Sequence, residues 1–219
     1  MTDLPDRLRL TVITDQALAR PRQVVEVVRE ALAAGAPAIQ LRLKDATSRE
    51  LLEAAQELLP IVRTAGGLFI VNDRVDVALA AGADGAHLGP DDPPIKDART
   101  AVREVLGAEG TAFVLGFSVD TPDGAARAEA EGADYLGVGA VYATANKEDA
   151  GEVIGLEGLR LVVEAVSIPI IAIGGITPER AIAVAQTGAC GIATIGAVMA
   201  SPDPATAVRS LLLPFGVNR

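Results

Sequence analysis

The most constraining feature of this 219-residue sequence is an alternation of short apolar runs with amphipathic stretches, repeated eight times. Apolar runs rich in Val, Ile and Leu predict buried parallel strands, and apolar residues at helical spacing predict the helices between them. The predicted strands are Leu10–Thr14, Ala38–Leu43, Leu68–Asn72, Gly85–Leu88, Ala112–Phe117, Tyr135–Val138, Pro169–Ile173 and Gly191–Ile195. The predicted helices are Pro21–Ala34, Ser48–Ala65, Arg74–Ala81, Ile95–Leu106, Pro122–Glu131, Leu156–Val166, Pro178–Gln186 and Pro204–Leu212. This order indicates an α/β fold with a parallel sheet.

Eight such units favour a closed (β/α)8, or TIM, barrel that forms a single domain over residues 1–219. An open doubly wound sheet is the alternative, but no Gly-x-Gly-x-x-Gly sequence follows the first predicted strand. Phrases such as AAGAPAIQL, AAGADGAHLG, AEGADYLGVG and QTGACGIATIG precede several strands. They match the Gly-containing turns that join a helix to the next strand, so they support the barrel and say nothing about a ligand.

Composition narrows the classes of protein that this chain can belong to. A formal net charge of −10 argues against nucleic-acid binding, which needs a basic face. Cys190 is the only cysteine, which excludes an intrachain disulfide and a Cys-based zinc site and favours a reduced, cytoplasmic protein. The start MTDLPDRLRL does not read as a secretory signal, and glycines divide the uncharged stretch 181–202, so we expect no membrane span. Assembly into a homo-oligomer is compatible with the sequence.

The sequence IQLRLKD, residues 39–45, alternates apolar and polar side chains as a strand does. In a barrel, Leu41 and Leu43 would pack on the helices, and the other face would line the interior towards the carboxyl-terminal mouth. That other face carries Gln40, Arg42 and Lys44. Buried cations need a counter-anion, which is either a bound ligand or an internal ion pair with the aspartate that follows the third strand.

Acidic and amide side chains follow the third and fourth predicted strands, where Asn72 and Asp73 precede His87, Asp91 and Asp92 along the chain. Adjacent parallel strands lie about 4.8 Å apart, so carboxylates at their ends can converge on one cation. We expect Asp73 and Asp92 to hold Mg²⁺, which takes one or two carboxylates and completes its shell with water and phosphate oxygens. Asp91 fits a turn or helix cap better, and His87 fits a packed, hydrogen-bonded residue better than a catalytic base.

The last three strand-to-helix loops carry residues suited to binding phosphate. A long loop follows the sixth strand, paired glycines follow the seventh, and a further glycine follows the eighth. Backbone N–H groups after strands seven and eight form the common phosphate site of such barrels. The residues concerned are Thr144, Asn146, Lys147, Gly174, Gly175 and Gly196. Two bound anions would account for the polar residues of the mouth. A diphosphate with a metal would lie near the cations, and a monophosphate would lie at the backbone N–H groups after strands seven and eight.

Taken together, these motifs resemble the thiamine-phosphate synthase family in order and spacing across nearly the whole chain. The matching segments are QLRLK, NDR-D, GADGAHLG--D, GFS, GADYLGVGAVYATANK, IAIGGITPE and ASPDPATAV. The resemblance implies a Mg²⁺-dependent barrel enzyme that joins 4-amino-2-methyl-5-(diphosphooxymethyl)pyrimidine to 4-methyl-5-(2-phosphooxyethyl)thiazole or its carboxylate form. The products would be thiamine phosphate and diphosphate.

By position, the resemblance also implies roles for single residues. The pyrimidine diphosphate would contact Gln40, Arg42, Lys44, Asn72, Ser118 and Lys147. Catalysis would rest on Arg42, Lys44, Ser118 and Lys147, with Mg²⁺ on Asp73 and Asp92. The thiazole phosphate would contact Thr144, Asn146, Gly175, Ile195 and Gly196. No Ser-His or Cys-His pairing is evident in the sequence, which agrees with a reaction that needs no protein nucleophile.

Two positions depart from the family pattern, since Asn146 stands where Thr is common and Gly196 where Ser is common. Three alternatives to the synthase stay open: a thiazole tautomerase, a sugar-phosphate epimerase, and a non-catalytic relative that binds phosphate ligands. The tautomerases typically carry His shortly after the serine of their Gly-x-Ser sequence, whereas this chain has Val119 and Asp120 after Ser118. The cations expected at Arg42, Lys44 and Lys147 also favour the synthase over the isomerases.

Overall fold

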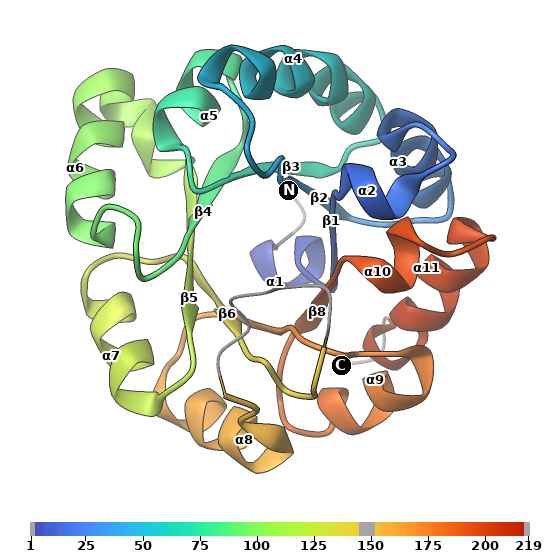
Figure 1. Ribbon diagram of the computed structural model, residues 1–219. Helices are drawn as coiled ribbons and strands as arrows, with labels where there is room; N and C mark the ends of the chain where they lie inside the picture. Colours follow the sequence, from blue (N-terminus) through green and yellow to red (C-terminus); the bar gives the residue numbers. More distant parts are fainter. Residues whose placement is uncertain (1–2, 145–151, 217–219) are drawn as a thin grey trace.

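Each strand of the computed structural model pairs in parallel with its neighbours along the chain, and the last strand pairs with the first, so the sheet closes (Figure 1). The structure describes residues 3–144 and 152–216. The strands are β1 (Leu10–Ile13), β2 (Ala38–Leu41), β3 (Leu68–Asn72), β4 (Gly85–Leu88), β5 (Val114–Val119), β6 (Tyr135–Val138), β7 (Ile170–Ala172) and β8 (Gly191–Thr194). The predicted (β/α)8 barrel is therefore confirmed.

The helices ring the strands and cover their outer faces (Figure 1). The longer helices are α3 (Val24–Ala33), α4 (Ser48–Thr64), α5 (Val75–Ala81), α6 (Ile95–Leu106), α7 (Pro122–Ala130), α8 (Gly155–Ala165), α9 (Pro178–Ala185) and α11 (Pro204–Leu212). The shorter ones are α1 (Leu4–Arg7), α2 (Gln16–Ala19), η1 (Gly107–Thr111), α10 (Gly196–Met199) and η2 (Leu213–Phe215). None of the described helices is long and apolar enough to span a membrane.

Local capping residues explain where several helices begin. At α4, the Thr47 hydroxyl accepts the Glu50 N–H at 3.3 Å, while the Glu50 carboxylate accepts the Thr47 N–H at 2.8 Å. Helix α11 begins after Asp203, whose carboxylate accepts the N–H of Thr206 at 3.0 Å. Such caps satisfy N–H groups that have no partner within the helix.

Many boundaries differ from the sequence-based expectation, most of them by one or two residues. Strand β2 ends at Leu41 instead of Leu43. Strand β5 spans Val114–Val119 instead of residues 112–117, and the N–H of Ala112 bonds back to Glu109 at the end of the 3-10 helix η1. The short helices were not predicted, since three to five residues are too few to show a helical period. The first predicted helix begins at Val24 instead of Pro21, because residues 21–23 are not helical.

Aspartates in the Gly-Ala-Asp phrases secure the amino ends of neighbouring strands. The Asp84 carboxylate accepts the backbone N–H of Phe69 in β3 at 2.8 Å, and the Asp134 carboxylate accepts that of Leu115 in β5 at 2.7 Å. Both aspartates thus satisfy a strand N–H that would otherwise lie buried and unpaired. The repeat seen in the sequence therefore serves the barrel and lies at the end away from the mouth.

The strand register shows which side chains face the interior. Asn72 pairs with His87, His87 with Gly116, and Gly116 with Tyr135, so these four residues form one interior layer. A Cβ atom on Gly116 would lie 2.2 Å from the Tyr135 ring and 2.5 Å from Nδ1 of His87. Glycine at this position therefore leaves the space that the two rings fill.

Candidate active site

A cavity of about 330 Å³ lies at the carboxyl ends of β5 to β8. Backbone and small side chains line most of it, which suits a ligand that is held by N–H groups. Of the predicted site residues, the cavity brings together Ser118, Thr144, Gly175, Ile195 and Gly196. The end of β5 and the loops after β6, β7 and β8 therefore meet at one place in the mouth.

The loop after β7 approaches the loop after β6 closely. Gly174 and Gly175 have φ angles of +102° and +61°, in the region that favours glycine. A Cβ atom on Gly175 would lie 2.6 Å from the carbonyl oxygen of Ala143. Helix α9 then begins at Pro178, as the sequence predicted, and Thr177 is its N-cap residue. Glycines are therefore needed both for the turn and for its packing.

The loop after β8 leads directly into the short helix α10, which begins at Gly196. A short extra helix after the eighth strand is a recurring part of barrel phosphate sites. The first turn of any helix has N–H groups that no intrahelical carbonyl accepts. Ile195 and Gly196 bring these groups to the cavity wall.

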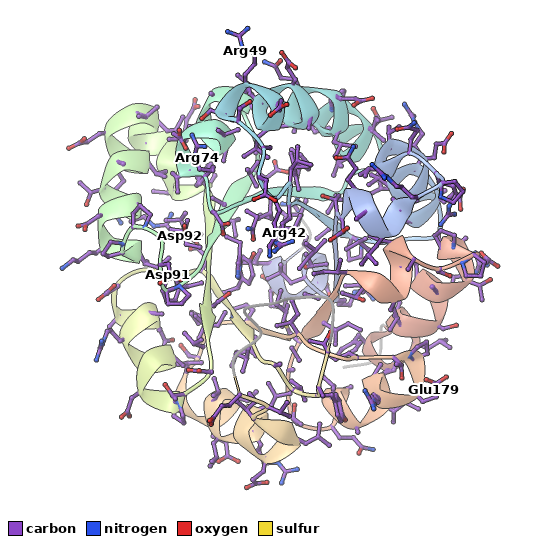
Figure 2. The ribbon with its side chains drawn as sticks, viewed as in Figure 1. Arg42, Arg49, Arg74, Asp91, Asp92 and Glu179 are labelled. Atoms are coloured by element: carbon purple, nitrogen blue, oxygen red, sulfur yellow. The ribbon has the colours of Figure 1, made fainter. Side chains whose placement is uncertain are left out.

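Arg42 lies just past the end of β2 and is half-buried. Figure 2 shows its side chain over the middle of the barrel. Within the described part of the chain, Arg42 forms no ion pair with a carboxylate, so the internal pairing considered from the sequence is not seen for it. Its guanidinium is available to an anion in the mouth.

Gln40 and Lys44, the other two polar residues of this segment, lie in different environments. Gln40 is 3% exposed and faces the interior, as expected. Lys44 lies in an exposed turn, next to Asp45 with a φ angle of +61°. The expectation that Lys44 lines the barrel interior is therefore wrong, because β2 ends at Leu41 and the strand alternation does not extend to Lys44. Leu43 is half-buried against the core, as expected for the outer face.

The two predicted metal ligands come from loops that follow adjacent strands. Asp73 is exposed, has a φ angle of +64°, and donates its backbone N–H to the carbonyl oxygen of His87 at 2.8 Å. Asp92 uses one carboxylate oxygen to accept the N–H of Gly89 at 2.7 Å, while Asp91 is exposed (Figure 2). Left-handed backbone at a non-glycine residue is often found at functional sites.

The carboxylates of Asp73 and Asp92 fit Mg²⁺ by their chemistry. Both offer hard oxygen donors. In Asp92, Oδ2 accepts the N–H of Gly89, and Oδ1 is the oxygen that could bind a cation. Among the described residues, no group of three or more His, Cys, Asp or Glu side chains could hold a metal by itself. A cation here would depend on water and substrate oxygens as well, which is the usual behaviour of Mg²⁺.

A chain of polar contacts crosses the barrel beneath the mouth. Nε2 of His87 lies 2.9 Å from the Ser118 hydroxyl, and its Nδ1 lies 2.9 Å from the Tyr135 hydroxyl. The Gln40 side chain lies near the same hydroxyl and lowers the pKa of the Tyr135 phenol, against the effect of burial. His87 is thus packed and hydrogen-bonded as expected, but the expectation that the chain has no Ser-His pairing is wrong.

Sequence reasoning did not single out Tyr135. Aromatic residues inside predicted strands are ordinary core residues, and the preceding Gly-Ala-Asp phrase gives no sign of a polar role. Gln40, His87 and Tyr135 lie on β2, β4 and β6, each two strands from the next along the ring, so only the curvature of the barrel brings the three together. Two predicted residues, Asn146 and Lys147, lie outside the described residues.

Comparison with known proteins agrees with the motifs in the sequence. A family model described as Thiamine monophosphate synthase matches residues 10–198. A thiamine-phosphate synthase of Moorella thermoacetica is 49% identical over 202 residues, which cover 92% of this chain and 93% of that protein. A thiamine-phosphate synthase of Pyrococcus furiosus is 48% identical over 209 residues, 95% of each chain.

Solved structures give the same relationship. A thiamine phosphate pyrophosphorylase from Pyrococcus furiosus superimposes with a TM-score of 0.84 and 48% identity, covering 95% of this chain and 96% of that chain. A 3-hexulose-6-phosphate synthase superimposes with a TM-score of 0.69 but 18% identity, so it shares the fold alone. The family model and the relatives at nearly half identity extend over most of the chain, and the chain therefore belongs to the thiamine monophosphate synthase family.

Proposed function

We propose that this protein joins 4-amino-2-methyl-5-(diphosphooxymethyl)pyrimidine to a thiazole phosphate and releases thiamine phosphate and diphosphate. The observation that carries the proposal is the meeting of two different anion environments in one mouth. One is the glycine-lined cavity at β5 to β8. The other lies at the ends of β2 and β3, where Arg42 could bind an anion directly and Asp73 could do so through Mg²⁺. The named relatives support the same reaction.

The thiazole phosphate suits the glycine-lined cavity. Its monophosphate would accept backbone N–H groups at Gly175 and at Ile195 and Gly196, near the start of α10. Thr144 would add a hydroxyl from the facing loop. Asn146 stays a predicted contact. Gly196 supplies its N–H but no hydroxyl, so binding here depends on the backbone.

The pyrimidine diphosphate suits the other half of the mouth. Arg42 can hold two phosphate oxygens at once with its planar guanidinium, and Lys44 can reach in from its exposed turn. Asp73 and Asp92 would hold Mg²⁺, which when bound offsets negative charge on the diphosphate. Asn72 would contribute its amide at the end of β3, and Lys147 stays a predicted third cation.

The reaction needs no protein nucleophile. The bond between the pyrimidine methylene carbon and the diphosphate oxygen breaks, and its electron pair leaves with the diphosphate. The amino group of the pyrimidine delocalises the positive charge, and the lone pair of the thiazole nitrogen forms the new carbon–nitrogen bond. Arg42 and the other cations accelerate the reaction because they bind the departing diphosphate more strongly than the intact substrate.

The proposal is tested by incubating the protein with Mg²⁺ and both substrates and measuring thiamine phosphate and diphosphate together. The expected result is equal amounts of the two products, and no product without either substrate. A thiazole tautomerase would instead convert its thiazole substrate without the pyrimidine. Absence of thiamine phosphate, under conditions in which a working synthase produces it, would reject the proposed function.

We also propose that the protein works in the cytoplasm. Support comes from the single cysteine, Cys190, which suits a reducing compartment. Both proposed substrates are charged phosphate esters, which do not cross membranes unaided. Fractionation of cells that express the chain with a small tag would test this location.

A further inference from the structure

His87 connects the cavity to the interior of the barrel through both of its ring nitrogens. Nε2 faces the Ser118 hydroxyl and Nδ1 faces the Tyr135 hydroxyl, each at 2.9 Å. His87 is 8% exposed and Tyr135 is fully buried, whereas Ser118 is half-buried and lines the cavity. Only the serine end of this chain of contacts therefore reaches the ligand space.

The space for this pair of rings is built into the strands. The ring centroids of His87 and Tyr135 lie 5.4 Å apart. A Cβ on Gly116 would overlap both side chains, and a Cβ on Gly137 would lie 3.0 Å from Cε1 of His87. The backbone of β5 and β6 thus fixes where the imidazole lies. The position of the imidazole does not by itself determine which ring nitrogen carries the proton.

The donors in this chain can be ordered from their chemistry. A phenol is a stronger proton donor than an amide, and a neutral imidazole nitrogen is a stronger acceptor than an amide oxygen. Burial raises the pKa of the Tyr135 phenol, so its proton is retained. The nearby Gln40 side chain opposes that rise, which agrees with an amide N–H directed at the phenolic oxygen. The stronger donor of the two, the Tyr135 hydroxyl, is then the group suited to donate to Nδ1 of His87, 2.9 Å away.

We propose that Gln40 and Tyr135 hold His87 in the Nε2-protonated form, so that His87 donates to Ser118 and the Ser118 hydroxyl donates its own proton into the cavity. His87 and Tyr135 are positioning residues that act through Ser118. The inference rests on the proposed function in one respect only, the identity of the ligand atom that accepts the Ser118 proton. That atom would be a hydrogen-bond acceptor such as a ring nitrogen of the aminopyrimidine.

This arrangement gives the Ser-His pair a role other than nucleophilic catalysis. A serine nucleophile needs a histidine nitrogen that accepts its proton, and a carboxylate commonly orients that histidine. Here the nitrogen that faces Ser118 carries a proton, and a phenol occupies the orienting position. Ser118 is therefore a fixed donor, in agreement with a reaction that forms no bond to the protein.

A double-mutant cycle tests the coupling in turnover. Tyr135→Phe should lower kcat/KM by about fivefold, since it removes one hydrogen bond that orders the histidine. In a Ser118→Ala background the same change should have no further effect, because Tyr135 acts only through Ser118. Equal effects of Tyr135→Phe in both backgrounds would overturn the inference.

The proton itself can be observed without turnover, so this measurement is independent of the proposed function. His87 is the only histidine in the chain, and a nitrogen-15 NMR spectrum of the histidine-labelled protein therefore reports one ring. The expected result is a neutral ring protonated on Nε2, which shifts towards a mixture of tautomers in Tyr135→Phe. Tyr142→Phe removes the other tyrosine hydroxyl of the chain and should leave the spectrum of His87 unchanged. A ring protonated on Nδ1 or on both nitrogens in the unsubstituted protein would overturn the inference, and that outcome needs no variant to fold.

Discussion

The hydroxyl of Thr14 accepts the backbone N–H of Arg42 at 2.9 Å and donates to the carbonyl oxygen of Arg42 at 3.0 Å. Thr14 is 1% exposed and follows the last residue of β1. One side chain thus replaces the strand pairing that stops at Leu41 and fixes the backbone that carries the Arg42 guanidinium. The position of the proposed diphosphate-binding arginine therefore depends on its neighbouring strand.

Thr14→Val should weaken both the fold and the binding of the pyrimidine diphosphate. Valine has the shape of threonine, but it leaves the N–H and carbonyl of Arg42 without this partner, at a cost of about 1–3 kcal/mol in the free energy of unfolding. We expect the KM for the pyrimidine diphosphate to rise as well. Urea unfolding and steady-state kinetics measure the two effects.

Thr187→Val is the matched control, because Thr187 is also buried and its hydroxyl donates to the Val184 carbonyl at 2.7 Å, in the turn that follows α9. It should lower stability without changing KM. If both variants left KM unchanged, the Thr14 hydroxyl would have no part in positioning Arg42.

Arg42→Lys should lower kcat/KM by about tenfold to a hundredfold. Lysine keeps the charge but loses the planar fork that holds two phosphate oxygens, and charge-assisted hydrogen bonds contribute about 1.5–3 kcal/mol each. Arg49→Lys is the control, since Arg49 points away from the barrel on the outer side of α4 (Figure 2). Kinetics with the pyrimidine diphosphate as the varied substrate would give the comparison, and equal activity of both variants would make Arg42 a structural residue.

Gly175→Ala should raise the KM for the thiazole phosphate about tenfold or more and leave the KM for the pyrimidine diphosphate close to its original value. An alanine there meets both a left-handed backbone and the carbonyl oxygen of Ala143. Gly82→Ala separates the two causes, because Gly82 has a φ angle of +73° but no atom within 4 Å of the added Cβ. A similar rise in KM in both variants would contradict a local role for Gly175.

The Arg99–Asp134 ion pair should matter for stability and not for activity. The Arg99 guanidinium also donates to the carbonyl oxygens of Phe113 and Gly132, and Arg99 is 7% exposed. Arg99→Met should therefore lower the free energy of unfolding by about 3 kcal/mol. Activity per folded molecule should not change, because the pair lies at the amino ends of the strands.

Arg103→Met, on the exposed face of the same helix, controls for loss of charge and should change neither quantity by much. Thermal unfolding and kinetics below the unfolding transition would measure both variants. A large loss of activity in folded Arg99→Met would show that the two ends of the barrel are coupled.

The fold could be predicted from the sequence because hydrophobic periodicity is a local signal that is repeated eight times. Strand ends were less predictable: the end of β2 depends on the Thr14 side chain, which is remote in sequence from Lys44. Short helices such as α10 have no detectable period, and one of them, the 3-10 helix η1, precedes the shifted β5.

The candidate site was predictable to the extent that it follows from strand ends. Ser118, Thr144 and Gly175 belong to different strand ends or the loops after them, were expected to meet at the mouth, and do line one cavity. The contact between Tyr135 and His87 was not predictable, because it depends on glycines in facing positions that leave room for both rings. Their roles in catalysis, and those of Asn146 and Lys147, stay predictions.

The most direct test of the account is the initial rate of thiamine phosphate formation, with diphosphate measured in the same samples, over a titration of Mg²⁺. The unsubstituted protein should release one diphosphate per thiamine phosphate and lose activity in a chelator. Asp73→Asn keeps a residue that tolerates left-handed backbone but removes the charge, and it should be about a hundredfold to a thousandfold slower and need more Mg²⁺. Asp91→Asn should behave as the unsubstituted protein does. No thiamine phosphate from the unsubstituted protein, or full activity of Asp73→Asn without added Mg²⁺, would contradict the account.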